Sequence, residues 1–261
     1  MKILFSKYQG AGNDFIIIDN RLQKIQLSTQ QINFLCNRHF GIGADGLMLL
    51  ENSSVADFKM IYFNSDGKES SMCGNGGRCI VAFAQHNGII TKNNTTFEAI
   101  DGLHYAEILN NENVRLQMQD VSEIKKISND YILNTGSPHF VRLVDNVESI
   151  NVLEEGRKIR YSETFYEKGI NVNFLQIIDK HNVKVRTYER GVENETLSCG
   201  TGVTAAALVT AEIFQLTKDN IQIQTSGGTL FVDFEKQNNT YKNIFLTGNA
   251  TLIFKGEINI N

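Results

Sequence analysis

Apolar and polar positions in this chain alternate in short runs that predict many strands and only a few helices. Residues 14–19 and 47–50 are mostly apolar and read as buried strands. Ser28 precedes a helix-like stretch that runs through Cys36, and serine is a favoured N-cap residue. Two further apolar runs, 79–84 and 203–214, are helix-like. The pattern therefore predicts a mixture of strands and helices.

An internal repeat organises this pattern. Cys73 opens the sequence C-G-N-G and Cys199 opens C-G-T-G, and each is followed by a helix-like run. A strand-like run precedes each cysteine. The polar residues after these two runs include Asn64 and Arg190, each nine residues before its cysteine. Two matched motifs with matched spacing indicate two related structural halves.

Hairpin signals extend the repeat. Twenty-eight residues after each cysteine begins a dipeptide typical of tight turns, Asp101-Gly102 in the first half and Gly227-Gly228 in the second. We therefore expect each half to be a curled sheet with one central helix and a cysteine at the start of that helix. The boundary is expected near residue 120, which gives halves of residues 1–120 and 121–250.

The position of the two cysteines at helix starts suggests their chemistry. A helix N-terminus carries about half a positive charge and exposes unpaired N–H groups. These features shift a neighbouring thiol toward thiolate, away from its usual pKa near 8.5, and can hold an anion. The glycines after each cysteine let the backbone approach a ligand closely. We expect each loop to activate a sulfur and to bind a carboxylate.

Two such loops facing each other would form a two-base catalyst. If the halves enclose one cleft, the carbon next to a bound carboxylate lies between the two sulfurs. One thiolate can remove the α-proton while the other thiol donates a proton to the opposite face. The same N–H groups would stabilise the enediolate that develops. Such stereoinversion needs no cofactor in principle.

Composition and charge exclude several other classes. The 261 residues have a formal net charge of −4 and a pI of about 5.8, which argues against a nucleic-acid-binding protein. No apolar run approaches the length of a membrane span, and the first residues do not resemble a signal peptide. Four cysteines are too few for a disulfide framework. We therefore expect reduced thiols, a cytoplasmic location and no membrane partner.

Three other motifs point to structure rather than to function. Cys36 and His39 have a metal-ligand spacing, but no second pair follows, so no metal site is expected. Cys36 and Cys79 lie among apolar residues and are expected in the core. Residues 41–46 match G-x-G-x-x-G, but they follow a helix-like segment and precede a strand. This order is the reverse of a dinucleotide-binding fingerprint and indicates a glycine loop.

Four stretches of the sequence resemble a known family. They are Gly10–Phe15, Phe63–Cys79, Asn171–Phe174 and Tyr188–Gly202. In this order and spacing the chain resembles diaminopimelate epimerase over essentially its whole length. The resemblance implies cofactor-independent inversion of one stereocentre of LL-2,6-diaminopimelate to give the meso form, in lysine and cell-wall precursor biosynthesis.

The resemblance also implies a fold and an assembly. The expected fold is α+β, with two pseudo-symmetric halves that are each a β-barrel-like sheet around a central helix. A returning strand near residues 251–261 is expected to complete the first half. The active site is expected in the cleft between the halves, and the protein is expected to be a homodimer.

The site residues implied by the resemblance fall into three groups. Cys73 and Cys199 would be the catalytic base and acid, in an order set by the direction of turnover. His139 and Glu189 would tune the pKa values of the thiols, because an imidazolium lowers and a carboxylate raises the pKa of a nearby sulfur. The expected substrate-binding residues are Asn13, Asn64, Gly74, Asn75, Asn171, Glu189, Arg190, Gly200 and Thr201. Among these, Arg190 would pair the distal carboxylate and Glu189 an ammonium group.

Two positions depart from the family pattern. Ser137 stands where many members have an asparagine that contacts substrate. Gly46 stands where some members have a substrate-contacting glutamine, and it has no side chain for that role. Both departures bear on affinity or substrate range rather than on the type of reaction.

Two alternatives to this function are considered. One is a related two-thiol racemase acting on proline, 4-hydroxyproline or histidine. Proline-type members usually carry C-G-H-G at the first cysteine, whereas this chain has C-G-N-G at Cys73. The other alternative is a non-catalytic amino-acid-binding protein on the same scaffold, which the presence of both cysteines disfavours.

Overall fold

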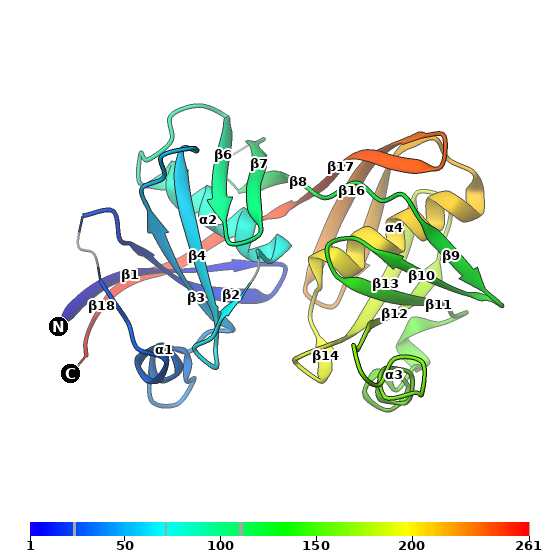
Figure 1. Cartoon of the computed structure of the whole chain (residues 1–261), viewed down its shortest axis with the longest axis horizontal. Helices are drawn as coiled ribbons and strands as arrows, with labels where there is room; N and C mark the ends of the chain where they lie inside the picture. Colours follow the sequence, from blue (N-terminus) through cyan, green and yellow to red (C-terminus); the bar gives the residue numbers. More distant parts are fainter. Residues whose placement is uncertain (23–24, 71, 110–111, 261) are drawn as a thin grey trace. The chain divides into compact units, whose positions relative to one another are not determined.

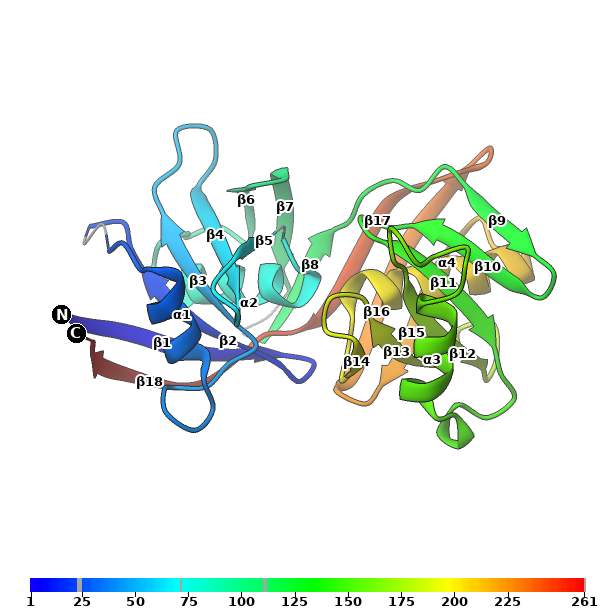
Figure 2. The ribbon, with the colours of Figure 1, turned by 60° about the horizontal axis from the view of Figure 1, so that its bottom comes forward.

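The computed structural model describes residues 1–22, 25–70, 72–109 and 112–260. The chain forms two compact units, one made of Met1–Leu116 with Asn249–Asn261 and the other of Gln117–Gly248. Figure 1 labels the elements of both units, and Figure 2 shows the same ribbon turned. Each unit is described separately below.

The first unit contains a mixed sheet and two helices in its described part. Residues far apart in sequence complete it, because β18 pairs antiparallel with β1 along its length. Backbone bonds between Met1 and Ile260 hold the two ends of the chain together. Its elements are β1 (Lys2–Gly10), β2 (Asn13–Asp19), α1 (Thr29–Cys36), β3 (Gly46–Glu51), β4 (Phe58–Asn64), β5 (Glu69–Ser70), α2 (Gly74–His86), β6 (Asn94–Ala99), β7 (Gly102–Ile108), β8 (Asn113–Gln117) and β18 (Thr251–Asn259).

The second unit repeats this layout. A short 3-10 turn and one helix lie where the first unit has α1, and α4 lies where the first unit has α2. Its elements are β9 (Ile124–Ile127), β10 (Asp130–Asn134), β11 (Pro138–Leu143), η1 (Val147–Ser149), α3 (Val152–Arg160), β12 (Asn171–Ile177), β13 (Asn182–Glu189), β14 (Asn194–Thr196), α4 (Gly200–Phe214), β15 (Lys218–Thr225), β16 (Gly228–Gln237) and β17 (Thr240–Asn249).

The strand pairings confirm the repeat predicted from the two cysteine motifs. In the first unit β2–β3 is parallel, β3–β4 and β4–β5 are antiparallel, and β4–β6 is parallel. In the second unit β11–β12, β12–β13, β13–β14 and β13–β15 follow the same alternation. The outer strand differs in origin, since β9 directly precedes β10 in sequence whereas β18 comes from the end of the chain.

Each sheet curves around one buried helix, giving the two α+β, barrel-like halves that the resemblance implies. The helix α4 contacts strands along the whole second sheet, from β10 and β11 through β13 to β15 and β16. Figure 1 shows α4 lying against these strands. Its residues are mainly alanine, valine and leucine, which are buried from Val203 to Ala211. A helix that is apolar on all sides is expected only in such a core position.

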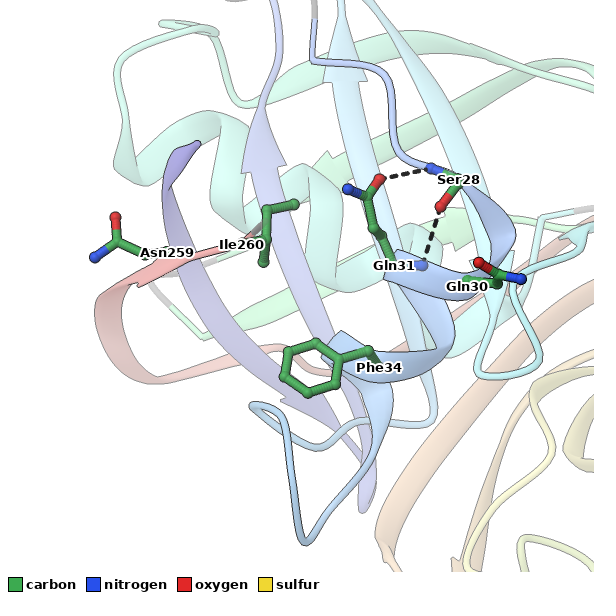
Figure 3. A pocket seen from close by; sticks show the side chains of 6 residues that line it. All are labelled: Ser28, Gln30, Gln31, Phe34, Asn259 and Ile260. Atoms are coloured by element: carbon green, nitrogen blue, oxygen red, sulfur yellow. Dashed lines mark hydrogen bonds between the residues drawn. The ribbon is translucent and has the colours of Figure 1, made fainter.

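Local sequence signals match the observed elements. Ser28 caps α1 through a capping box, in which its hydroxyl accepts from the Gln31 N–H and the Gln31 side chain accepts from the Ser28 N–H (Figure 3). The predicted hairpins join β6 to β7 and β15 to β16. Gly102 and Gly228 lie at these turns with φ angles of 122° and 141°, which L-residues with side chains rarely adopt.

Within the part of the chain that the structure describes, no helix is long and apolar enough to cross a membrane.

Candidate active site

The two motif cysteines each occupy the N-cap position of a central helix. Cys73 precedes α2 with φ −96° and ψ 134°, and Cys199 precedes α4 with φ −114° and ψ 113°. Their carbonyls accept the first helical bonds, from Gly77 N at 2.7 Å and from Val203 N at 2.8 Å. This confirms the prediction that a cysteine stands at the start of each central helix. The N–H groups of each first turn, which have no partner within the helix itself, lie beside a cysteine.

The other two cysteines are core residues, as their apolar surroundings predicted. Cys36 is 4% exposed and Cys79 is fully buried. Burial raises the pKa of each thiol to about 12. Both therefore remain protonated near neutral pH and are poor nucleophiles or bases compared with a thiol at a helix start.

In the first unit the structure brings Asn13, Cys73 and Asn75 together. The amide oxygen Oδ1 of Asn13 lies 3.6 Å from the sulfur of Cys73 and 3.5 Å from Nδ2 of Asn75. The other end of the same amide, Nδ2, donates to Oδ2 of Asp45 across 2.5 Å. Asn13 begins β2 directly after the turn that follows β1. The G-A-G-N-D-F stretch therefore forms this turn and positions the Asn13 amide beside the start of α2.

A charged network stands behind Asn13. Arg38 donates from Nη2 to Asp45 at 2.7 Å and to Asp14 at 2.7 Å. The buried ammonium of Lys7 lies 2.8 Å from Asp14. Burial alone would raise the pKa of Asp14, but the hydrogen bonds and charges of Arg38 and Lys7 hold it at about 2. Asp14 is thus ionised at neutral pH, and Arg38 links it to Asp45.

Arg78 supports the first turn of α2 and was missed by the sequence analysis. It is fully buried, with Nη1 donating to the Gly74 carbonyl at 3.1 Å and Nη2 to Asn75 Oδ1 at 2.9 Å. Burial lowers the pKa of this guanidinium. A charged residue between the glycine-rich motif and the apolar run 79–84 was the signal that could have identified it, since a charge there is costly to bury without partners.

Asn64 and Gly46 lie opposite each other at the ends of β4 and β3. Asn64 is exposed, as a ligand-binding side chain needs to be. A Cβ on Gly46 would lie 2.5 Å from the ring of Tyr62 and 2.7 Å from the Phe63 carbonyl. The Tyr62 ring therefore fills the space that a side chain at position 46 would occupy, and glycine fits there without a clash.

In the second unit His139 belongs to a buried polar cluster. Asn173 places Nδ2 3.0 Å from Nδ1 of His139 and donates to the Phe140 carbonyl at 3.0 Å. Thr187 donates to Asn173 Oδ1 at 2.9 Å. Burial lowers the pKa of His139 to about 3. The hydrogen bond with Asn173 raises this pKa slightly, and the positive charge of Arg190 lowers it further. His139 is therefore a neutral imidazole at pH 7.

This neutral state bears on the tuning role implied for His139. An imidazole without charge cannot lower the pKa of a thiol as an imidazolium would. It can act only through a hydrogen bond, and its Nε2 is buried and has no hydrogen-bond partner among the described residues. Nε2 is therefore the atom through which His139 could act on a ligand or a thiol.

The first turn of α4 packs directly on this cluster. A Cβ on Gly202 would lie 2.4 Å from Asn173 Oδ1 and 3.4 Å from the Cβ of Cys199. A glycine is therefore required here for the helix carrying Cys199 to approach Asn173. Thr201 is fixed as well, because Thr135 donates to its carbonyl at 2.9 Å and its hydroxyl lies 3.4 Å from the Cys199 sulfur.

Ser137, Asn171 and Arg190 form a second polar cluster in this unit. Asn171 Nδ2 donates to Ser137 Oγ at 2.9 Å and to the Pro138 carbonyl at 3.2 Å. Asn171 Oδ1 accepts from the backbone N–H of Arg190 at 2.8 Å. The Arg190 guanidinium donates to the Lys168 carbonyl at 3.0 Å and to Ser137 Oγ at 3.4 Å. Asn171 thus holds the backbone of Arg190 and the hydroxyl of Ser137, a residue that departs from the family pattern.

The strand register revises one correspondence between the two halves. Tyr62 pairs with Ser70, and Thr187 pairs with Thr196, where Ser70 and Thr196 each lie three residues before their cysteine. Two residues beyond these strand positions lie Asn64 and Glu189 respectively. The counterpart of Asn64 is therefore Glu189 and not Arg190, because the paired residues Thr187 and Thr196 are one residue further apart in sequence than the paired residues Tyr62 and Ser70. Thr196 donates to Glu189 Oε2 at 2.9 Å.

The predicted site residues therefore gather into one group per unit. The first unit brings together Asn13, Cys73, Gly74 and Asn75, with Asn64 at the end of a neighbouring strand. In the second unit Cys199, Gly200 and Thr201 lie at the start of α4, where the next residue, Gly202, packs on the Asn173 side chain that contacts His139. Asn171 begins β12, Glu189 ends β13, and Arg190 follows β13. Each group combines a sulfur, a helix N-terminus and polar side chains, which suits proton transfer beside a bound carboxylate.

Among the described residues, no three His, Cys, Asp or Glu side chains are close enough to hold a metal ion.

A hollow in the first unit lies apart from the predicted site residues. It lies between α1 and the end of β18 and is lined by Ser28, Gln30, Gln31, Phe34, Asn259 and Ile260 (Figure 3). Its lining contains no ionisable side chain and none of the predicted site residues.

Comparisons with known proteins agree with the geometry of the two units. A model of the family described as diaminopimelate epimerase matches residues 5–124 and 131–253. A diaminopimelate epimerase of Flavobacterium psychrophilum is 53% identical over 97% of this chain and 98% of its own length. One from Chlorobaculum tepidum is 43% identical, covering 96% of this chain and 99% of its own.

Solved structures with much lower identity share the fold. A phenazine biosynthesis protein of the PhzF family from Bacillus anthracis has a TM-score of 0.78 at 16% identity, with complete coverage of both chains. A hydroxyproline epimerase from Agrobacterium vitis has a TM-score of 0.68 at 15% identity, covering 98% of this chain and 92% of its own. The two-unit fold therefore occurs in proteins that are named for different chemistry.

Proposed function

Because this chain belongs to the diaminopimelate epimerase family, we propose that it is an isomerase that converts LL-2,6-diaminopimelate to meso-diaminopimelate with Cys73 and Cys199 as its two bases. Identity of 53% over nearly the whole chain to a diaminopimelate epimerase is the observation that carries the activity. The residue roles below are inferred from the geometry within each unit and from the family resemblance.

The reaction proceeds by proton transfer on two faces of one carbon. The thiolate of one cysteine removes the α-proton, which leaves the electron pair delocalised into the adjacent carboxylate as an enediolate. The thiol of the other cysteine then donates its proton to the opposite face, so that the configuration inverts and no net proton is gained or lost. The cysteine that acts first depends on which epimer is bound.

The N-terminal turns of α2 and α4 bind the reacting carboxylate. Both N-cap cysteines are followed by glycine, and the backbone N–H groups at Gly74-Asn75 and Gly200-Thr201 are the donors proposed for this group. Negative charge increases on the carboxylate oxygens as the enediolate forms. Prearranged N–H donors stabilise the enediolate-like transition state more strongly than they stabilise the bound substrate. This difference lowers the barrier and accelerates the reaction.

Polar side chains are assigned to the distal amino-acid head of the substrate. Arg190 has a backbone held by Asn171 and a guanidinium that can pair a carboxylate in a fork geometry. Glu189 meets an ammonium group, and Asn13, Asn64 and Asn171 complete the set. We expect these residues to favour a substrate with a second zwitterionic head over proline-like amino acids.

The proposed function also includes the cellular setting. We place the enzyme in the cytoplasm because all four cysteines are free thiols and the chemistry depends on reduced sulfur. A homodimer is proposed from the family resemblance, with light scattering of the purified protein as its test.

Deuterium exchange tests the proposed function directly. Reduced, purified protein is incubated with LL-diaminopimelate in heavy water without added cofactor. We expect deuterium at one α-carbon and formation of the meso isomer. Failure of the folded, reduced protein to exchange deuterium would refute the two-base reaction. Parallel incubations with proline, 4-hydroxyproline and histidine should show no exchange, and exchange with one of these instead of diaminopimelate would identify a related racemase.

A further inference from the structure

A short chain of hydrogen bonds connects Arg78 to Asp45 and passes the sulfur of Cys73. Arg78 Nη2 donates to Asn75 Oδ1 at 2.9 Å, and Asn75 Nδ2 donates to Asn13 Oδ1 at 3.5 Å. Asn13 Nδ2 then donates to Asp45 Oδ2 at 2.5 Å. The Cys73 thiol lies 3.6 Å from the same Asn13 oxygen.

The chemistry of the two ends dictates how both amides are turned. A guanidinium has only donors, so Asn75 must present its oxygen to Arg78 and its NH2 group to Asn13. An ionised carboxylate has only acceptors, so Asn13 must present its NH2 group to Asp45. The oxygen of Asn13 therefore faces Cys73. The donor-to-acceptor direction of these hydrogen bonds follows from Arg78 and Asp45, independently of how the N and O atoms of the two amides are assigned.

An acceptor in this place favours one protonation state of the sulfur. A protonated thiol can donate to Asn13 Oδ1, whereas a thiolate would face the negative end of the amide dipole. We propose that Asp45 is a positioning residue that, by orienting the Asn13 amide, presents an acceptor to Cys73 and favours its protonated thiol form. The proposal rests on the proposed function in giving Cys73 a proton-transfer role, and it adds a residue outside the substrate-binding set.

Asp45 is itself well placed to transmit a change. Its Oδ1 accepts from Arg38 at 2.7 Å, and its Oδ2 accepts from the Asp14 N–H at 3.2 Å as well as from Asn13. In Asp45→Asn the single remaining oxygen pairs with the charged Arg38 donor. The new NH2 group then faces the NH2 group of Asn13, so the Asn13 amide loses the acceptor that holds its oxygen beside Cys73. The fixed acceptor that favours the protonated thiol is thereby removed, and the thiolate becomes more favourable than in the wild type.

The other charged or titratable groups near Cys73 stay in place in this variant. Arg78 and Cys79 interact electrostatically with Cys73 from α2. On the preceding side, Met72 donates its N–H to Asp101 at 3.4 Å, and Asp101 pairs with His104 at 3.1 Å. None of these contacts involves Asp45. Lys7 and Asp14 lie behind Arg38 and retain their own ion pair.

The test measures the pH dependence of Cys73 alkylation by iodoacetamide in the free protein. Mass spectrometry of the peptide containing Cys73 separates its reaction from that of the other cysteines. The four proteins compared are the wild type, Asp45→Asn, Asn13→Ala and the double variant. Asp45 is exposed and Asn13 is half-buried. Circular dichroism and thermal unfolding verify that each protein is folded. Asp66→Asn, which removes an exposed carboxylate of the same unit, is the matched charge control.

The expected result is a double-mutant cycle with strong coupling. Asp45→Asn should lower the midpoint of Cys73 alkylation by about one pH unit, and Asp66→Asn should leave it unchanged. In the Asn13→Ala background, Asp45→Asn should have no further effect. An equal shift of the alkylation midpoint in both backgrounds would mean that the Asp45 carboxylate acts by charge alone, which would overturn the proposal. No shift, or an upward shift, in the wild-type background would overturn it as well. The readout needs no turnover, so it can fail or succeed independently of the epimerase assay.

Discussion

The side-chain amide of Asn173 donates from Nδ2 to Nδ1 of His139 across 3.0 Å. The orientation of this amide is certain because its nitrogen also faces the Phe140 carbonyl, an acceptor, at 3.0 Å. Nδ1 of His139 must therefore be an acceptor, and the proton of the neutral ring lies on Nε2. The structure thus selects one tautomer of His139 through a residue of the N-V-N-F stretch that sequence reasoning passed over.

The neutral His139 predicts a loss of stability in acid. Its pKa is lowered to about 3 in the folded protein from an ordinary value of 6.5. Between these values the unfolded chain binds a proton that the folded chain does not, so stability falls as pH decreases through this window. His139→Gln should remove up to about 1.4 kcal/mol per pH unit of this dependence. Urea unfolding from pH 7 to 4 measures it.

His39→Gln provides the matched control for this experiment, because His39 is exposed. That variant should retain the wild-type slope of unfolding free energy against pH. If His139→Gln and wild type show the same slope, burial of a neutral His139 is not the source of acid sensitivity.

Gly202 and Gly76 are repeat-related glycines that should respond differently to alanine. A Cβ on Gly202 would lie 2.4 Å from Asn173 Oδ1, whereas the nearest atoms to a Cβ on Gly76 are at 3.5 Å. Gly202→Ala should destabilise the protein by about 1–3 kcal/mol through overpacking and displace Asn173. Gly76→Ala should be within about 1 kcal/mol of wild type, since alanine favours the helix. Equal losses in denaturant unfolding would contradict this difference.

Ser137 should contribute to substrate affinity through the groups it holds. Its hydroxyl accepts from Asn171 at 2.9 Å and from Arg190 at 3.4 Å. Ser137→Ala leaves these donors unsatisfied, and a net hydrogen bond of about 1 kcal/mol corresponds to roughly a fivefold rise in KM. Steady-state kinetics with diaminopimelate measure the effect. Ser149→Ala, whose hydroxyl bonds only locally to the Asn146 carbonyl, should leave KM unchanged.

The two N-cap cysteines should be far more sensitive than the two core cysteines. Cys73→Ala and Cys199→Ala each remove a proton-transfer group, and we expect a loss of at least about 10²–10⁴-fold in kcat. Cys36→Ala should retain turnover, because Cys36 is a buried thiol with a pKa of about 12. Full epimerisation by either N-cap variant would end the two-base mechanism.

Local and periodic features were predictable because they depend on residues that are close in sequence. The capping box at Ser28, the hairpin at Gly102 and the N-cap position of Cys73 each follow from a few neighbouring residues. The spacing of nine residues from Asn64 to Cys73 was less informative. The sequence separation of the equivalent strand pairs differs by one residue between the two halves, which changes the polar residue at the equivalent strand position. Only the strand register reveals this difference.

By itself the sequence determined the repeated architecture, the helix-start location of Cys73 and Cys199, and the family. These follow from periodicity and from glycine-flanked motifs, whose conformational requirements are local. Only the tertiary structure decided how Arg78, Asn75, Asn13 and Asp45 join into one directed chain of hydrogen bonds. The same holds for the neutral state of His139. Hydrogen-bond direction and desolvation depend on groups that folding brings together from distant parts of the sequence, and no local pattern contains that information.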